Sequence, residues 1–391
     1  MSFNLSSCVP APVCKDRTTK FTSLDSIIDI SSYYGDSSKK DWVAQGEPAA
    51  MGGDVLLTMP KNSVGTVLAS TTYMWYGNVK ARFKTSRGQG VVTAFILLSD
   101  IKDEIDYEFI GSDLKTAQTN YYFQGVIDYH NSGNITLSDT FANYHDYEIR
   151  WTPDKIEWLV DGQVGRTKER KDTWNSTTQN WMFPQTPARV QLSIWPGGAA
   201  SNPKGTVDWA GGPIDWNNAP DIKSVGYYYS AFSEVSIQCY NAQNAPGTNK
   251  GTSYVYNNVA ATNNTIVDGD ADTVLGSFLG TGFNLMKDKA SASQSGDAPK
   301  NTAATIPGGG NGAAGNDHGG DSGNTGGSSG GSSGSGGSGS SGGANSNCPA
   351  NSFSQDCGNN ADGKNNGKSG GSKASASALA MVIAGVALCW L

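Results

Sequence analysis

The sequence is poor in charge, in histidine and in basic clusters. Of its 391 residues 16% are charged, 28 are Lys or Arg against 35 Asp or Glu, and three are His. Binding of nucleic acid needs Lys and Arg gathered on one surface, and no basic run of any length occurs, so we expect no nucleic acid partner. Because His is scarce and no C-x-x-C pair occurs, we also expect no metal site and no cofactor.

A long hydrophobic run is also missing. The C-terminal apolar stretch, ALAMVIAGVALCWL at residues 378–391, is shorter than the about 20 residues that span a bilayer. It follows the small and polar residues NNGKSGGSKASAS, and this order is the signal for a glycolipid (GPI) anchor, with attachment expected between Asn365 and Gly371. The alternative is a tail-anchor helix. The Gly/Ser-rich stalk and the glycosylation sequons described below argue against it. We expect an extracellular protein that meets the membrane through a lipid anchor only.

Glycine is abundant but unevenly placed. Most of the 50 Gly lie in the last third of the chain, whereas the ten Trp and sixteen Tyr lie almost wholly before residue 257. Residues 307–377 are mainly Gly, Ser and Asn, a composition that cannot bury enough apolar surface to order itself, so we predict a disordered stalk there. Aromatic residues already thin out over residues 241–306, which we expect to be an extension of low order.

Short alternating runs between residues 53 and 240 predict β-strands. They are GDVLLTM, TVLAS, GNVKARFKTS, VVTAFILLS, EIDYEFIG, HDYEIRWT, KIEWLVDG, ARVQLSIW and SEVSIQCY. The VDG at residues 160–162 is a hairpin-turn signal. Many short strands without a helical apolar stripe predict one all-β domain over residues 20–240, a sandwich of two antiparallel sheets. Its aromatic, weakly charged composition suits a neutral polar ligand such as sugar.

Cysteine spacing leaves the disulfides open. The six cysteines are Cys8, Cys14, Cys239, Cys348, Cys357 and Cys389. Cys8 with Cys14, and Cys348 with Cys357, are close enough for short-loop disulfides, but Cys14 could equally reach Cys239. Sequons for N-glycosylation occur at Asn4, Asn134, Asn175 and Asn263. Together with the C-terminal signal they favour a secreted protein.

Three acids stand two residues apart in DEIDYEFIG. Because alternate residues of a strand face the same way, Glu104, Asp106 and Glu108 share one face, while the apolar residues between them face the core. A solvated acidic strand is the alternative. It is disfavoured because the preceding VVTAFILLS has the character of an interior strand, and like charges in line repel one another.

Glycoside cleavage supplies a reason for this row. Cleavage with retention uses two carboxyls about 5 Å apart, one as nucleophile and one as acid/base. Residues four apart on a strand have Cα atoms about 13 Å apart, and two Glu side chains that lean together close most of that gap. The middle Asp would hydrogen-bond the nucleophile, and crowding would leave one Glu ionised and the other protonated.

The motif E-I-D-Y-E resembles the E-x-D-x-E signature of glycoside hydrolase family 16. The wider order of TAFILLSDIKDEIDYEFIGSD, TNYYFQG, YHDYEIRWTPDKIEWLVDGQVGR and LSIWPGG is similar to that of the fungal Crh/Utr2 cell-wall transglycosylases. The resemblance covers roughly residues 20–240, and the stalk and tail fit it. It implies a β-jelly-roll whose concave face is the substrate cleft.

The resemblance also implies roles for individual residues. Glu104 would be the nucleophile, Asp106 its assistant, and Glu108 the acid/base that also touches the sugar. Donor-sugar contacts would come from Gln191, Trp195 and Thr206, although the family often has a basic residue where Gln191 stands. Further candidates for stacking on sugar rings, each with core packing as the alternative, are Tyr121, Tyr122, Phe123, Trp209 and Trp216.

The implied reaction joins two wall polymers. The family cuts chitin as the donor and passes it to β-1,3- or β-1,6-glucan as the acceptor, which places the protein in the cell wall. We expect it to be a monomer. A hydrolytic endo-β-glucanase of the licheninase kind and a non-catalytic wall carbohydrate-binding protein are the alternatives. The resemblance further implies that residues 1–19 are the junction after a leader and a small chitin-binding module.

Overall fold

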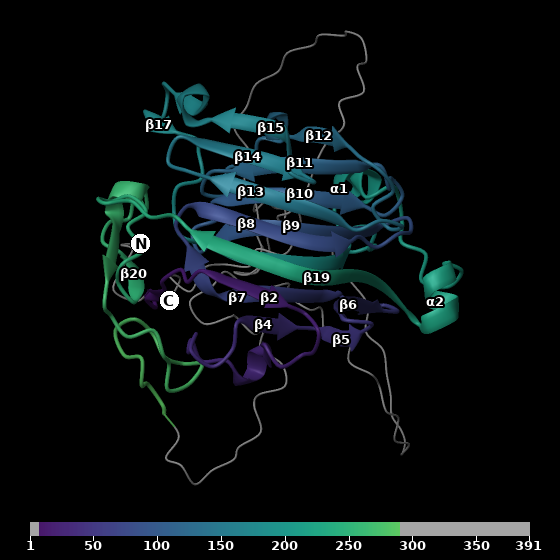
Figure 1. Cartoon of the computed structure of the whole chain (residues 1–391), viewed down its shortest axis with the longest axis horizontal. Helices are drawn as coiled ribbons and strands as arrows, with labels where there is room; N and C mark the ends of the chain where they lie inside the picture. The colour runs from purple at the N-terminus through teal and green to yellow at the C-terminus, as the bar shows by residue number, and fades with distance from the viewer. Residues whose placement is uncertain (1–7, 290–391) are drawn as a thin grey trace, which may run out of the picture. The chain divides into compact units, whose positions relative to one another are not determined.

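The computed structural model describes residues 8–289. The predicted stalk at 307–377, the tail at 378–391, residues 290–306 of the predicted extension, and the sequon at Asn4 lie outside the described residues. Within them, two large sheets lie one over the other, and Figure 1 shows β13, β8 and β19 in front of the strands of the other sheet. The predicted all-β fold class is confirmed.

The first sheet has eight strands in the order β12-β11-β10-β9-β18-β7-β4-β3. All of its pairs are antiparallel except β3 with β4, which is parallel. Its strands are β3 (Ile27–Asp29), β4 (Trp42–Gln45), β7 (Thr66–Met74), β9 (Val91–Ser99), β10 (Glu104–Ile110), β11 (Thr116–Tyr122), β12 (Gly133–Thr136) and β18 (Ala188–Pro196).

The second sheet also has eight strands, seven in the order β15-β14-β13-β8-β19-β6-β5 and β2 paired with β19. They are β2 (Arg17–Lys20), β5 (Glu47–Met51), β6 (Asp54–Pro60), β8 (Gly77–Lys84), β13 (His145–Trp151), β14 (Lys155–Val160), β15 (Gln163–Glu169) and β19 (Tyr227–Cys239). Every run that the sequence predicted as a strand forms one, in one sheet or the other.

Small elements complete the described part of the chain. A hairpin joins β16 (Trp174–Asn175) to β17 (Asn180–Trp181), and two short helices, α1 (Lys204–Trp209) and α2 (Pro220–Val225), lie between β18 and β19. Four 3-10 turns are Ile30–Ser32, Tyr129–Asn131, Arg170–Thr173 and Asn263–Thr265. No helix within residues 8–289 is long and apolar enough to cross a membrane.

The core lies between the two sheets and is rich in aromatic rings. Phe83 of β8 meets Phe109 of β10 edge-on at 5.5 Å, and Tyr147 of β13 meets the same Phe109 at 4.8 Å. Offset and edge-on ring pairs of this kind add to the stabilisation that comes from burying their area. The contacts hold β10 against the second sheet.

The VDG signal marks a tight hairpin, as predicted. Asp161 and Gly162 join β14 to β15 with φ angles of 50° and 79°. Two positive φ angles are those of a type I′ turn, whose twist matches that of the flanking strands.

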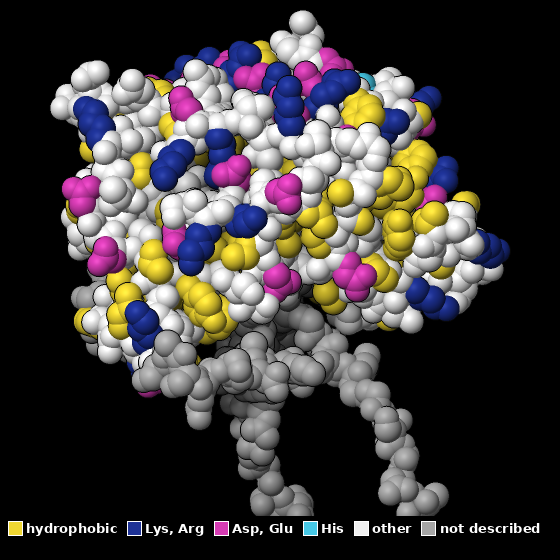
Figure 2. Space-filling model, turned by 60° about the horizontal axis from the view of Figure 1, so that its bottom comes forward, with side chains coloured by type: hydrophobic (Ala, Val, Ile, Leu, Met, Phe, Trp, Pro, Cys, Tyr) yellow, Lys and Arg dark blue, Asp and Glu magenta, His cyan; other side chains and the backbone are white. Residues whose placement is uncertain are grey.

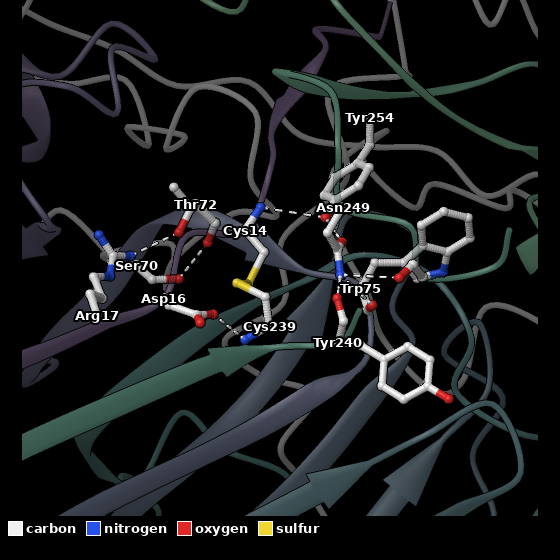
Figure 3. Close-up of a disulfide and its surroundings, with 11 residues drawn as sticks. Cys14, Asp16, Arg17, Ser70, Thr72, Trp75, Cys239, Tyr240, Asn249 and Tyr254 are labelled. Atoms are coloured by element: carbon white, nitrogen blue, oxygen red, sulfur yellow. Dashed lines mark hydrogen bonds between the residues drawn. A yellow bond between two sulfur atoms is a disulfide. The ribbon is translucent and has the colours of Figure 1, made fainter. Parts of the chain in front are cut away.

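The structure decides the pairing of Cys14. Its disulfide joins Cys239 at the end of β19, across 225 residues of sequence, so the alternative pairing with Cys8 is wrong. Figure 3 shows this disulfide beside Trp75, Tyr254 and Asn249. The pairing follows from the sheet, because β2 lies along β19 and brings the N-terminal segment to the end of that strand. Such a bond is typical of proteins that fold in an oxidising compartment.

The extension expected to have low order contains strands within its described part. β20 (Ser253–Tyr256) and β21 (Ile266–Gly269) form a three-stranded sheet with β1 (Ala11–Pro12). Their order depends on a partner at the other end of the chain, which local composition does not reveal.

On the outer surface, charges of both signs are mixed. In Figure 2, Lys and Arg side chains alternate with Asp and Glu on the face shown, and do not gather in one basic area.

Candidate active site

Strand β10 presents its three acids together on the face turned away from the core. Ile105, Tyr107 and Phe109 belong to the core between the sheets. The alternate residues Glu104, Asp106 and Glu108 therefore point to the outer face of the first sheet, and their exposed fractions are 2%, 0% and 4%. These carboxyls form a buried row rather than a solvated strand edge.

The backbone of β10 is tied to the sheet behind it. The Trp158 indole of β14 donates to the carbonyl of Asp106 at 3.0 Å. The Tyr107 hydroxyl in turn donates to the carbonyl of Leu159 at 2.9 Å. These two bonds connect the sheets and hold the backbone of β10 in a fixed position against β14.

The start of β10 is held by a fourth acid, Asp103. Its carboxylate accepts four hydrogen bonds: the backbone N–H of Gln124 on one oxygen, and on the other the N–H groups of Gln185 and Thr186 and the Thr186 hydroxyl. Asp103 is 1% exposed. Asp103 directly precedes Glu104, so these bonds connect the start of β10 to the loop at Gln124 and to the loop at Gln185 and Thr186.

The neighbours of the row differ on its two sides. On β9, Leu98, Ile96 and Ala94 are in register with the three acids and form a small apolar cluster of their own. On β11, Tyr122, Asn120 and Gln118 occupy the corresponding positions. The acid row thus has apolar side chains on the β9 side and polar side chains on the β11 side.

Tyr122, one of the expected sugar contacts, lies on this face. It is in register with Glu104, and its hydroxyl accepts a hydrogen bond from the Asn120 amide at 2.7 Å. Burial and the charges of the acid row raise the pKa of Tyr122. The Tyr122 phenol therefore stays neutral beside the carboxyls.

Burial controls the protonation of the row. It raises the pKa of Glu104 to about 7 and that of Glu108 to about 8. Burial, and then the charges of both Glu residues, raise the pKa of Asp106 well above its usual range. The interaction between the two side chains raises the pKa of Asp106 and lowers that of Glu104, so Asp106 holds its proton more tightly than Glu104.

This order separates the charge states of the two Glu residues. Of the three carboxyls, Glu104 loses its proton first, and Glu108 keeps its proton to higher pH. Among the described residues no hydrogen-bond donor reaches Glu104 Oε1 or Glu108 Oε1. One oxygen of each Glu is thus not engaged by a described donor, and nucleophilic attack and proton donation each require such an oxygen.

Gln191 and Trp195 share the face of the acids. Both lie on β18, where Gln191 is in register with Ile96, itself opposite Asp106. Trp195 is in register with Val92 and stacks on Trp209 of α1 with ring centres 6.0 Å apart. Period-2 alternation predicts from the sequence that Gln191 and Trp195 face the same way as each other, and the strand pairing puts that face with the acids.

Helix α1 brings a second tryptophan towards the row. The Trp209 indole donates to the side-chain oxygen of Gln118 at 2.9 Å, and Gln118 is in register with Glu108. Thr206 lies three residues earlier in this helix, is buried, and has no hydrogen-bond partner for its hydroxyl among the described residues. Thr206 is therefore on an element that reaches the site.

Other aromatic candidates belong to the core instead. Tyr121 faces the core with Ile105, its register partner, and Trp216 packs against the same core beside Tyr228. Phe123 is also buried, at 6% exposure. For Tyr121 and Trp216 the structure favours core packing over sugar stacking, because their rings are turned towards the core of the sandwich.

Sequence reasoning missed Gln118 and Asn120. They alternate with Tyr122 in TAQTNYY, next to the acid strand, and this period-2 polar pattern is a signal that could have found them. Asp103 was passed over because it lies outside the alternation of the triplet. No cluster of three or more His, Cys, Asp or Glu suited to a metal ion occurs within residues 8–289.

Comparison with known proteins decides the family. The model of Glycosyl hydrolases family 16 matches residues 36–211. Crh-like protein 2 of Aspergillus fumigatus (strain ATCC MYA-4609 / CBS 101355 / FGSC A1100 / Af293) is 48% identical over 321 residues, which are 81% of this chain and 72% of that protein. The chain belongs to glycoside hydrolase family 16. The resemblance stated from the acid motif is thereby confirmed.

Two further similar proteins support this placement. Crh-like protein 3 of Botryotinia fuckeliana (strain B05.10) is 65% identical over 292 residues, 75% of this chain and 66% of that protein. The solved structure of the Crh5 transglycosylase in complex with NAG superimposes with a TM-score of 0.55 at 29% identity, over 67% of this chain and 97% of that one. The fold and the family 16 enzyme class agree with the sequence-based expectation.

Proposed function

We propose that this family 16 protein is a retaining transglycosylase that cleaves chitin and transfers the released chain to β-glucan. The observation that carries the proposal is the row of Glu104, Asp106 and Glu108 on one face of β10, with proton affinities that differ along the row. Retaining glycoside cleavage needs one ionised and one protonated carboxyl side by side. The transglycosylase among the structural neighbours supports transfer as the outcome.

In the first step, ionised Glu104 attacks the anomeric carbon of the donor sugar. The bond from that carbon to the glycosidic oxygen breaks, and protonated Glu108 gives its proton to the leaving oxygen. Asp106 donates a hydrogen bond to Glu104 and steadies its negative charge until the ester has formed. The product of this step is a glycosyl ester on Glu104.

In the second step, Glu108 reverses its role. As a carboxylate it takes the proton of an acceptor hydroxyl, whose oxygen attacks the same anomeric carbon and releases Glu104. Two inversions give overall retention. We assign sugar contacts in the substrate cleft over this face to Glu108, Gln191, Trp195, Thr206 and Tyr122. In this assignment Trp195 offers a ring face, and the others offer hydrogen-bonding atoms.

An assay with two labelled polymers tests the proposal. The protein is incubated with a chitin oligosaccharide donor and a fluorescent β-1,3-glucan acceptor, beside Glu104→Gln and the matched surface variant Glu47→Gln, at an exposed residue of β5. A labelled hybrid from wild type and Glu47→Gln, but not from Glu104→Gln, supports transfer. Reducing ends without hybrid product would instead identify a hydrolase, and binding without turnover a carbohydrate-binding protein.

We further propose that the protein acts as a monomer at the cell wall and the outer face of the plasma membrane, held by a GPI anchor. The Cys14–Cys239 disulfide supports an oxidising, extracytoplasmic location. The anchor rests on the C-terminal sequence pattern. Release of the protein from membranes by a phosphatidylinositol-specific phospholipase tests the anchor, and size-exclusion chromatography with light scattering tests the monomer.

A further inference from the structure

Arg189 is a buried arginine whose guanidinium is only partly hydrogen-bonded by the described residues. Its side chain is 1% exposed, and its Nε donates to the carbonyl of Ser70 at 2.6 Å. Neither Nη1 nor Nη2 has a hydrogen-bond partner within the described part of the chain. Buried arginines are normally paired, because an unmatched guanidinium in a protein interior is costly.

The residue lies on the face of the catalytic row. On β18 it is in register with Leu98 of β9, which is itself in register with Glu104, so the three side chains point to the same side. Neighbouring strands are about 4.8 Å apart, which puts the Cα atoms of Arg189 and Glu104 about 10 Å apart, roughly two sugar lengths. A chain that crosses the strands over Glu104 would pass over Arg189.

A β-bulge holds this arginine in place. The pairing of β18 with β7 shifts register between Arg189 and Gln191. At the bulge, the Ser70 hydroxyl accepts the N–H of Val190, and the Ser70 carbonyl accepts Arg189 Nε. Bulges often redirect a side chain beside an active site. Here Nε is fixed, while no residue between positions 8 and 289 accepts a hydrogen bond from either terminal nitrogen.

Two aromatic rings flank the guanidinium, and the nearby carboxylates have other partners. Arg189 lies 6.0 Å from the ring centre of Tyr33 and 5.5 Å from that of Tyr73. Asp100 accepts the Tyr73 hydroxyl, and Asp41 is paired with Arg17. Both rings are themselves buried, with exposed fractions of 2% for Tyr33 and 1% for Tyr73, and the guanidinium lies over them. What the site offers a sugar is therefore the two Nη groups, which have no hydrogen-bond partner among the described residues and match the oxygens of a sugar.

We propose that Arg189 is a carbohydrate-binding residue of the cleft, whose Nη groups donate to hydroxyl or acetamido oxygens of a sugar one or two units from the cleavage point. This inference rests on the proposed function and adds a contact that it does not contain. The sugar belongs to the donor or to the acceptor, and the two are separated by varying the length of one polymer at a time.

The test compares Arg189→Met and Arg189→Lys with wild type. We expect kcat/KM to fall about 10- to 100-fold for chains long enough to reach Arg189, because hydrogen bonds to a charged group are lost. For the shortest active chains it should stay within about twofold. Loss on longer donors places the sugar on the donor side, and loss on longer acceptors places it on the acceptor side. The Lys variant should recover little, since it lacks the planar fork.

Thermal unfolding separates binding from support of the fold. Arg189→Met should keep or raise the melting temperature, because Met removes a buried charge whose two Nη groups have no hydrogen-bond partner among the described residues. The matched control is Arg166→Met, since Arg166 donates to the carbonyl and hydroxyl of Thr119 at 2.8 Å and its loss should lower the melting temperature. Equal kcat/KM for all lengths, or a loss of stability in Arg189→Met that Arg189→Lys restores together with activity, would overturn the proposal.

If wild type shows no transfer, the contact can still be tested by measuring sugar binding directly. Calorimetry with chitin and β-1,3-glucan oligosaccharides, on Glu108→Gln with and without Arg189→Met, measures the contact without turnover. At least a 10-fold weaker Kd in the double variant supports it. Unchanged sugar affinity, or an Arg189-dependent response to inorganic phosphate alone, would show that the residue does not bind glycan.

Discussion

Replacing Glu108 by Gln should make the protein more stable at neutral pH while abolishing transfer. Burial raises the pKa of Glu108 in the folded protein to about 8, whereas an unfolded Glu titrates near 4.3. Since the folded state holds this proton more tightly, ionisation costs folding free energy as pH rises from about 4 to about 8. Gln has nearly the same shape and never ionises, so it removes that cost.

The size of the effect follows from the distance between the two pKa values. At pH 7 the upper bound is about 4 kcal/mol, from 1.36 kcal/mol per pKa unit between 4.3 and 7. Water that enters around the ionised carboxylate lowers this cost, so we expect a gain of about 1–3 kcal/mol. For a domain of this size that corresponds to a rise in Tm of about 2–10 °C.

Differential scanning calorimetry at pH 4, 7 and 9 measures the gain against wild type. Glu47→Gln, at an exposed surface position, is the matched control and should change Tm by less than about 1 °C at each pH. The advantage of Glu108→Gln should be smallest at pH 4, where both states are largely protonated, and largest at pH 9. A lower Tm of Glu108→Gln at pH 7, or a gain independent of pH, would refute the reasoning.

Three further predictions concern the support of the site and its modification. Asp103→Asn should lower the rate of transfer at least 10-fold and the free energy of unfolding by about 2–4 kcal/mol. The reason is that the four donors now held by two carboxylate oxygens would face a neutral amide with a single acceptor oxygen. An unchanged kcat together with an unchanged urea midpoint would contradict this. Replacing Cys14 and Cys239 by Ala should cost about 3–5 kcal/mol by urea unfolding, since the bond closes a loop of 225 residues; a loss below about 1 kcal/mol would speak against it. In protein secreted from a yeast host, peptide mass spectrometry should find glycan on exposed Asn134 but not on Asn263, whose amide donates to a tyrosine hydroxyl; the reverse pattern would be a failure.

Much of the fold was predictable because it is written in local pattern. Alternation of apolar and polar residues marked β8, β10 and β13, and the Asp-Gly turn marked the β14–β15 hairpin. The same alternation put Glu104, Asp106 and Glu108 on one side of their strand, and Gln191 and Trp195 on one side of theirs. Period-2 geometry needs no knowledge of the partner strands.

Other features depend on which strands become neighbours. The adjacent residues Tyr121 and Tyr122 turn to opposite faces, and only the register of β10 with β11 brings Tyr122 to the acids. The order within residues 253–269 likewise requires β1, from the opposite end of the described chain.

The sequence by itself determined the strands, the acid row and, through the spacing of that row, the kind of chemistry. Only the tertiary structure decided that Cys14 meets Cys239, that Asp103 anchors the start of the acid strand, and that Arg189 lies buried on the face of Glu104, two strands away, with two nitrogens that no described residue pairs. The reason is physical. Side-chain direction along a strand follows from backbone geometry within a few residues, whereas burial, pairing and pKa depend on groups brought together from distant parts of the chain.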